Sequence, residues 1–300
     1  MTNKNNIDGV INIYKDMGYT SHDVVAILRR TLGIKKIGHT GTLDPNVSGV
    51  LPICVGASTK ISSYLMNHKK TYLGELTFGY ETDTEDIWGN ITDRCDYIPT
   101  IEELNNVIAT IDGKDILQTP PMYSAIKVDG KKLYELARDG KEIERKKRNA
   151  HIHKIELIRY IDGKAHIKVI CSKGTYIRTL FKDIARACKS LGTMSSLIRL
   201  SSGGFNIKDS VTLSEIEELS KNGITDFYVS ADKALENIKK VNIPEFLFNK
   251  VINGVAIKTN LLGLKLDEDK EYLVYCKDEF IGVYHHLDNI LKVKTYLYKR

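Results

Sequence analysis

Asp44 has the clearest potential for chemistry, because it is a lone carboxylate in a turn of small residues. The surrounding stretch, residues 38–60, is GHTGTLDPNVSGVLPICVGASTK. Gly38 and Gly41 would let a large planar substrate approach the backbone, and Pro45 favours an extended conformation at Asp44. A carboxylate held in this way could act as a nucleophile. The same residue types are also typical of ordinary surface turns, so the loop alone leaves both interpretations open.

Two further polar side chains, Tyr176 and Arg178, follow a predicted turn at residues 172–174. On extended backbone, residues two apart point in the same direction, so this spacing predicts a hydroxyl and a cation aimed at one pocket. A guanidinium forks well onto a carboxylate, and Arg178 could therefore orient an acid such as Asp44. The alternative is an amphipathic strand end with an arginine on the surface.

Tyr72 and Lys15 are weaker candidates. Tyr72 begins the apolar face of a predicted strand over 71–80, where alternate residues share one side. Aromatic residues are common strand formers, so a core position is favoured over a platform for substrate. Lys15 follows an apolar strand and could either contact a phosphate or be exposed to solvent.

The elements that must position these residues mix strands and helices without regular βαβ alternation, which indicates an α+β fold. Asp162-Gly163 between two strands predicts a tight hairpin. Ser21, Thr100 and Thr212 are predicted helix N-caps, the last two within capping boxes. The predicted strands are 9–15, 49–56, 71–80, 150–160, 164–172 and 195–200, and the predicted helices are 22–32, 57–68, 100–111, 131–140, 179–191 and 212–223.

A domain boundary is predicted near residues 239–244. The segments beyond it are short, strand-rich and punctuated by turns, for example EYLVYCKDEF and LKVKTYLY. This pattern predicts a small β-barrel-like module over 245–300.

Composition narrows the class of protein. The chain has 300 residues, of which 42% are hydrophobic and 27% charged, as in ordinary soluble globular proteins. It has no apolar stretch of membrane-spanning length, and its polar N-terminus lacks the apolar core of a signal peptide, so we expect a cytoplasmic protein. The five cysteines are scattered and form no C-x-x-C pair, so neither a disulfide framework nor a zinc site is expected.

Charge is unevenly distributed along a chain whose net charge is +6. Residues 127–160 contain eleven lysines and arginines, whereas residues 81–103 contain eight acids and one arginine. A polarised surface of this kind would suit a polyanion such as nucleic acid. The alternative is two solvated charged faces.

Four blocks of sequence carry a resemblance when they are taken together. They are the stretch 38–60 quoted above, KTYLGELTFGYETDTEDIWG (70–89), PPMYSAIKVDGKKLYELARDG (120–140) and CSKGTYIRTLFKDIA (171–185). In combination they resemble the bacterial TruB family of tRNA pseudouridine-55 synthases, occur in the family's order and cover roughly residues 8–210. The resemblance implies a pseudouridine synthase fold, with a mixed, largely antiparallel central sheet flanked by helices.

The resemblance also implies a role for each candidate residue. Asp44 matches the catalytic nucleophile, and Arg178 matches the arginine paired with it. His39 matches a histidine that holds the flipped nucleotide, and Leu197 matches a leucine packed against the base. Tyr72 matches the tyrosine stacked on the target uracil, Tyr176 the active-site tyrosine proposed to take the proton from C5, and Lys15 a further residue on the substrate side.

The same resemblance divides the chain into domains. It implies a catalytic domain over 1–240 with an RNA-binding insertion at about 119–150, and a PUA-like RNA-binding domain over 241–300. The chain departs from the family after Lys15, where Asp16-Met17-Gly18 stands in place of Pro-x-Gly. The implied partner is the T-arm of tRNA, and the implied protein is a monomer without a metal or a cofactor.

The implied reaction moves the bond of ribose C1′ from uracil N1 to C5. A carboxylate could attack C1′, as in retaining glycosidases, or add to C6 of the uracil, and the sequence leaves both open. Two other functions stay open as well: a glycosyl hydrolase using Asp44, and a non-catalytic module that binds or folds tRNA. The target of a synthase could also be another structured RNA.

Overall fold

The computed structural model describes residues 7–124, 126–128, 130–140 and 143–298. The chain forms two compact units, each described by itself. The first consists of Met1–Pro45, Leu51–Met66 and Lys208–Arg300, and the second of Asn46–Val50 and Asn67–Ile207. Strand β3 (Ser48–Val55) therefore contributes its first residues to the second unit and its last residues to the first.

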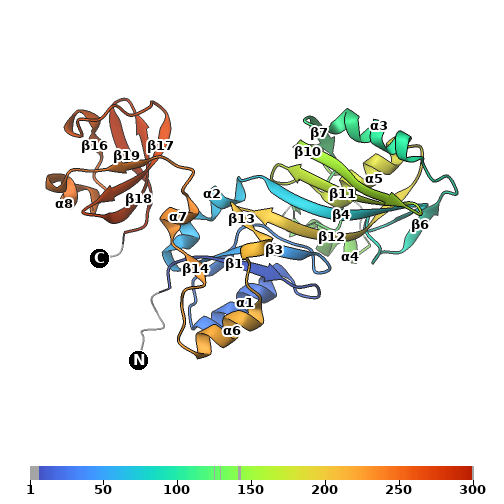
Figure 1. Ribbon diagram of the computed structural model, residues 1–300, viewed down its shortest axis with the longest axis horizontal. Helices are drawn as coiled ribbons and strands as arrows, with labels where there is room; N and C mark the ends of the chain where they lie inside the picture. Colours follow the sequence, from blue (N-terminus) through green and yellow to red (C-terminus); the bar gives the residue numbers. More distant parts are fainter. Residues whose placement is uncertain (1–6, 125, 129, 141–142, 299–300) are drawn as a thin grey trace. The chain divides into compact units, whose positions relative to one another are not determined.

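In the first unit, β1 (Gly9–Lys15) lies between β3 and β14 (Tyr228–Val229), and β2 (Ile37–His39) pairs with β3. Helices α1 (Ser21–Leu32) and α6 (Leu213–Lys221) lie side by side next to these strands (Figure 1). Each helix turns its buried aliphatic residues inward and its charged residues outward. The strand predicted over 9–15 is confirmed.

The predicted N-cap of α1 is wrong by one residue. Thr20 caps the helix: its side chain accepts a hydrogen bond from the Asp23 N–H, and the Asp23 carboxylate accepts one from the Thr20 N–H. Ser21 lies inside the first turn, where its hydroxyl forms hydrogen bonds with the backbone of Leu43 instead of capping the helix. The capping boxes predicted at Thr100 and Thr212 are confirmed.

In the second unit, the strand order is β3-β12-β4-β11-β10-β7, with parallel pairing only between β12 and β3 among these described strands. Helices α3 (Ile101–Ile111) and α5 (Ile177–Ala187) flank the sheet (Figure 1). The expected mixed, largely antiparallel sheet with flanking helices is confirmed. The strands are β12 (Gly192–Ser202), β4 (Lys70–Phe78), β11 (Lys164–Cys171), β10 (Arg148–Ile161) and β7 (Asp115–Gln118).

Local signals in the second unit act as predicted. Along β4, buried and half-buried residues alternate strictly, as expected for a strand with one face in the core. Asp162 and Gly163, both with positive φ (50° and 71°), make the two-residue turn between β10 and β11. Two short hairpins complete this unit: β5 (Tyr80–Thr82) with β6 (Ile91–Arg94), and β8 (Lys127–Val128) with β9 (Lys131–Lys132).

Two predicted helices are shorter than expected. The segment predicted as a helix over 57–68 is a 3-10 helix, η2 (Gly56–Ile61), followed by the short helix α2 (Ser62–Met66). The segment predicted over 131–140 begins as strand β9 and becomes helical in α4 (Leu133–Arg138). Helix α7 (Ala231–Ala234) then leads to the C-terminal part of the first unit.

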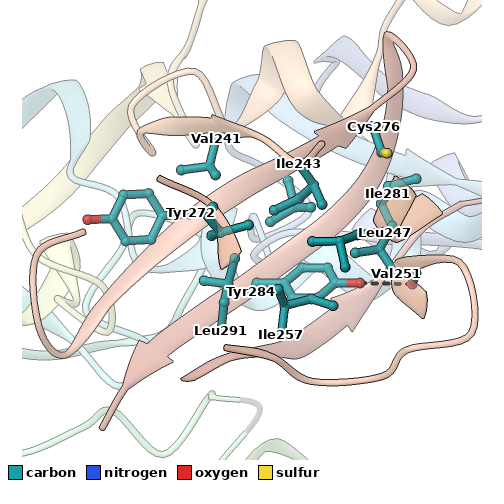
Figure 2. Close-up of a cluster of buried hydrophobic side chains, with 12 residues drawn as sticks. Val241, Ile243, Leu247, Val251, Ile257, Tyr272, Cys276, Ile281, Tyr284 and Leu291 are labelled. Atoms are coloured by element: carbon teal, nitrogen blue, oxygen red, sulfur yellow. Dashed lines mark hydrogen bonds between the residues drawn. The ribbon is translucent and has the colours of Figure 1, made fainter. Parts of the chain in front are cut away.

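The C-terminal part of the chain has its own five-stranded sheet and its own buried cluster (Figure 2). Tyr284 crosses this cluster and its hydroxyl donates to the carbonyl oxygen of Val251 at 3.0 Å, as the dashed line in Figure 2 shows. The expected strand-rich module is confirmed, whereas the boundary near residue 240 stays a prediction. The strands are β15 (Lys240–Asn242), β17 (Lys270–Cys276), β18 (Glu279–Leu287), β19 (Ile290–Tyr296) and β16 (Ile257–Lys258), and α8 (Phe248–Val251) packs with them.

Two searches of the described residues give negative results. None of their helices is long and apolar enough to cross a membrane. None of their His, Cys, Asp and Glu side chains form a group of three that could hold a metal ion.

Candidate active site

The loop that carries Asp44 is fixed on both sides of this residue. Before it, the buried Thr40 bonds to the carbonyl oxygen of Pro52 through both its N–H (3.1 Å) and its hydroxyl (3.2 Å). Closer still, the Ser21 hydroxyl accepts from the Leu43 N–H at 2.9 Å and donates to the Leu43 carbonyl at 3.3 Å. Asp44 itself is half-buried. The backbone on the N-terminal side of Asp44 is therefore held in place within the first unit.

Lys15 fixes the loop immediately after Asp44. The side chain of Lys15 is fully buried, and its ammonium group donates to the carbonyl oxygens of Asp16 (3.0 Å), Tyr19 (2.7 Å) and Pro45 (3.2 Å). The Gly18 N–H also donates to the Pro45 carbonyl, at 2.9 Å. Of the two alternatives for Lys15, exposure to solvent is wrong, because the charge is solvated by backbone carbonyls instead of water.

We expect Lys15→Met to destabilise the protein. The methionine keeps an unbranched apolar side chain but leaves partly buried carbonyl oxygens without their charged donor, which should lower the free energy of unfolding by about 2 kcal/mol. Urea unfolding followed by circular dichroism measures this. Lys36→Met, which removes an exposed ammonium group of the same unit, is the control. Equal unfolding midpoints for the two variants would contradict the structural role of Lys15.

His39 ends β2 at the entrance to the same loop. The Gly41 N–H donates to its Nδ1 at 3.4 Å. The ring also meets the edge of His22, with centroids 5.3 Å apart and planes at 76°. Gly41 has a φ of 141°, a conformation that favours glycine. His39 is thus half-buried and oriented by the chain that leads to Asp44.

Tyr72 and Leu197 lie on neighbouring strands of the second unit. On β4, Tyr72 is opposite Arg199 of β12, and Gly74 is opposite Leu197. A Cβ atom on Gly74 would lie 2.9 Å from a methyl carbon of Leu197 and 2.8 Å from the ring of Phe181. The glycine therefore leaves room for these two apolar side chains beside Tyr72.

Only Tyr176 of the pair Tyr176 and Arg178 lies on extended backbone, so the geometric basis given for their pairing is wrong. Helix α5 begins two residues earlier than predicted: Tyr176 is its N-cap, with φ −94° and ψ 107°, and Arg178 is already in its first turn. Residues two apart on a helix do not share a face. Tyr176 is half-buried, whereas Arg178 is only 5% exposed.

The buried guanidinium of Arg178 is held by neighbouring loops. One nitrogen donates to the carbonyl oxygen of Thr84 at 2.8 Å and another to that of Tyr123 at 2.9 Å. The carboxylate of Asp86 lies 3.8 Å from the same group. The planar fork of an arginine can reach several acceptors at fixed angles, so these contacts define where the charge lies.

The rest of the polar face of α5 is paired in the same way. Lys182 forms an ion pair with Glu85, which also accepts a hydrogen bond from the Thr179 hydroxyl at 2.6 Å. Arg186 binds Glu81 through two bonds of 2.7 and 2.6 Å, and this carboxylate raises the pKa of Arg186. Part of the acidic run at 81–103 is therefore buried against α5, and the interpretation of that run as a solvated face is wrong for these residues.

The basic insertion leaves the sheet after β7 and returns at β10. Arg145 donates to the carbonyl oxygen of Pro120 at 3.2 Å, which ties the returning chain to the outgoing one. Lys146, Lys147 and Arg148 follow it with exposed side chains. Lys141, which belongs to the predicted basic span, lies outside the described residues.

Comparison with known proteins decides the family. The family described as "TruB family pseudouridylate synthase (N terminal domain)" matches residues 29–177. The tRNA pseudouridine synthase B of Alkaliphilus oremlandii (strain OhILAs) is 44% identical over 278 residues, which make up 92% of this chain and 92% of that protein. The chain belongs to the TruB family of pseudouridine synthases.

Further similarities agree with membership of the TruB family. The tRNA pseudouridine synthase B of Clostridium kluyveri is 44% identical over 92% of this chain and 95% of its own length. A chain in the solved structure of an H/ACA RNP bound to a substrate RNA containing 2′-deoxyuridine superposes with a TM-score of 0.74, covers 97% of this chain and 86% of that chain, and is 22% identical. This last likeness shows the fold, which is the expected pseudouridine synthase fold.

Two residues of this TruB family member were missed by the sequence-based reasoning. Asp86 faces Arg178, and the buried amide of Gln118 bonds to the backbone of Tyr176. A signal for the first exists in the sequence, because Arg178, Lys182 and Arg186 recur every four residues on one face of α5 and need acidic partners. No local pattern points to Gln118, because its partner is far along the chain.

Proposed function

We propose that this TruB family enzyme isomerises uridine to pseudouridine at position 55 in the T-arm of tRNA. The observation that carries the proposal is the 44% identity to a tRNA pseudouridine synthase B over 92% of both chains. The fixed position of the Asp44 loop supports it, because a nucleophile must be held in one place while the substrate is brought to it.

Asp44 acts as the nucleophile in this proposal, and Arg178 orients its carboxylate. The bond from ribose C1′ to uracil N1 breaks, and C1′ is then bonded to C5. The C5 proton leaves, its electron pair becomes part of the ring, and N1 gains a proton, so no atom is gained or lost overall. The reaction is therefore complete without an oxidant or a group donor, and the protein's task is to orient, to attack and to move one proton.

The base must leave the helical stack of the RNA before this chemistry, at a cost of a few kcal/mol. Tyr72 and Leu197 are suited to stacking against the flipped uracil, and His39 to holding the flipped nucleotide. Tyr176 is suited to accepting the proton from C5. We propose that these four residues and Asp44 take part in the reaction, with Lys15 in a positioning role for the Asp44 loop.

The basic insertion contacts the phosphates of the T-arm in this proposal, and residues 241–300 add a second RNA-binding surface. Cations along a phosphate backbone supply affinity without reading sequence. We further propose that the protein works as a monomer in the cytoplasm, where its tRNA substrate is found.

The basic insertion gives a testable expectation. Replacing Lys146, Lys147 and Arg148 by glutamine should weaken tRNA binding and flatten its dependence on salt. The slope of log K against log salt should fall by about 0.7–0.9 for each phosphate that the protein no longer neutralises. Arg145 is left unchanged because it holds the Pro120 carbonyl. Binding isotherms at several salt concentrations measure the slope.

The matched control removes three exposed cations from the first unit, by replacing Arg30, Lys36 and Lys221 with glutamine. It changes the net charge equally and should alter the slope less. If the slope falls equally in both variants, the insertion has no special contact with the phosphates and its cations are only exposed to solvent.

The proposed function is tested by incubating the protein with an unmodified tRNA transcript and mapping pseudouridine at single-nucleotide resolution. We expect conversion at the T-arm uridine and at no other site. A transcript that stays unmodified, or is modified elsewhere, overturns the proposal.

A further inference from the structure

Gln118 is the only glutamine in the chain and it is almost completely buried, with 2% of its surface exposed. It is the last residue of β7, where it is paired across the sheet with Arg148 of β10. A buried primary amide has to satisfy both a donor and an acceptor, so its partners are informative.

Both partners of this amide belong to the backbone of one residue, Tyr176. The Gln118 Nε2 donates to the Tyr176 carbonyl oxygen at 3.1 Å, and the Gln118 Oε1 accepts from the Tyr176 N–H at 3.1 Å. Only one orientation of the amide satisfies both bonds, because Tyr176 offers one donor and one acceptor there. The side chain thus pairs with Tyr176 as a neighbouring peptide strand would.

Two bonds to one residue fix the peptide groups on either side of its Cα atom. They therefore set the direction in which the Cα–Cβ bond of Tyr176 points, and with it the starting position of the phenol. The local sequence does not provide this constraint: Tyr176 is the N-cap of α5 and its side chain makes no capping bond. Tyrosine is also not among the residues that favour an N-cap.

The same contact joins Tyr176 to the rest of the proposed site. The Tyr176 carbonyl also accepts the first helical hydrogen bond, from the Leu180 N–H at 2.9 Å, so the amide of Gln118 holds the start of α5. Arg178 lies in that first turn and is itself bonded to Thr84 and Tyr123.

We infer that Gln118 is a positioning residue for the isomerisation, acting through the backbone of Tyr176. The inference rests on the proposed function. The side chain acts on the orientation of the tyrosine and does not touch the uracil. Its loss should slow the chemical step and leave the affinity for tRNA unchanged.

Two substitutions separate this role from a contribution to stability alone. Gln118→Met has a similar length and shape but makes neither bond. Gln118→Glu is isosteric, and its behaviour depends on protonation: a neutral carboxyl group has one donor and one acceptor and can replace the amide, whereas a carboxylate has no donor and repels the Tyr176 carbonyl. The charged residue directly opposite, Arg148, has an exposed side chain.

The measurement is the single-turnover rate of pseudouridine formation with saturating enzyme in excess over tRNA, and tRNA affinity is measured in parallel. We expect the single-turnover rate of Gln118→Met to be at least tenfold lower than that of the wild-type protein. The affinity for tRNA should change by less than twofold. For Gln118→Glu the quantity of interest is its rate divided by the wild-type rate at the same pH. We expect this relative rate to rise at least threefold as the pH falls from 8.5 to 6.

The matched control is Ser190→Ala, which removes a buried side-chain bond beyond the other end of α5, from the Ser190 hydroxyl to the Tyr97 carbonyl at 2.5 Å. It should lower the melting temperature without changing the single-turnover rate. Amide hydrogen exchange over residues 172–180 gives a readout independent of activity, and Gln118→Met should speed exchange at Tyr176.

A full rate in Gln118→Met, or a relative rate of Gln118→Glu that does not change with pH, overturns the inference. The inference is also overturned if Ser190→Ala and Gln118→Met lower the melting temperature equally and lower the single-turnover rate equally. Failure of the proposed function is a separate result, since the wild-type protein would then form no pseudouridine.

Discussion

Asp44→Asn is expected to abolish pseudouridine formation while tRNA affinity stays within about tenfold, a difference of about 1.4 kcal/mol. Asparagine has the shape of aspartate but no negative oxygen with which to attack carbon. The fold should survive, because Thr40, Leu43 and Pro45 hold the loop through contacts that this substitution leaves in place. Single-turnover assays with enzyme in excess over tRNA, together with a binding assay, measure both quantities.

The control for this variant is Asp16→Asn, which removes an exposed carboxylate from the same part of the chain. It should keep most of the activity. An Asp44→Asn protein that still works at a tenth of the original rate would contradict the assignment of Asp44 as the nucleophile.

Arg178→Lys is expected to lower the single-turnover rate by at least a hundredfold, which corresponds to about 2.7 kcal/mol. The charge is kept, but an ammonium group cannot reach the carbonyl oxygens of Thr84 and Tyr123 and the Asp86 carboxylate at the angles that a guanidinium fork allows. The positive charge should then move away from the place where we propose that it orients the nucleophile. Affinity for tRNA should change little, because Arg178 is buried.

Arg186→Lys provides the comparison on the same helix. Arg186 also forks onto a carboxylate, that of Glu81, but its side chain is 58% exposed. Lysine keeps a positive charge beside the buried Glu81, and Arg186 lies near the other end of α5 from Arg178, so the rate of this variant should stay within about twofold of the original. If the rate falls equally in the two variants, the effect of Arg178→Lys lies in the stability of α5 and not in the site.

Local chemistry predicted those parts of the fold that depend on neighbours in sequence. Thr100 and Thr212 each cap a helix and donate their N–H to a glutamate three residues on, and the turn at Asp162-Gly163 needs two residues with positive φ. Strict alternation along β4 placed Tyr72 on the buried face. These features are decided within a few residues, so the sequence carries enough information about them.

The errors occur where distant residues compete for the same group. Ser21 is as good a cap as Thr20 by residue type, but its hydroxyl is taken by Leu43. Tyr176, the residue before α5, is bonded through its backbone to Gln118, and the buried Glu81 and Glu85 are paired with cations of α5. A residue pattern shows which groups need partners, but the folded chain decides which partners they find.

The insertion between β7 and β10 begins and ends at residues that are already paired. Gln118 and Arg148 are partners across the sheet, so the ends of the intervening chain are held about 5 Å apart. Closing a longer loop between fixed ends costs only about 0.6 kcal/mol for each doubling of its length. The segment that we propose to face RNA can therefore gain or lose residues over evolution with little loss of stability to the sheet. Changes near Tyr123 are the exception, because its carbonyl binds Arg178.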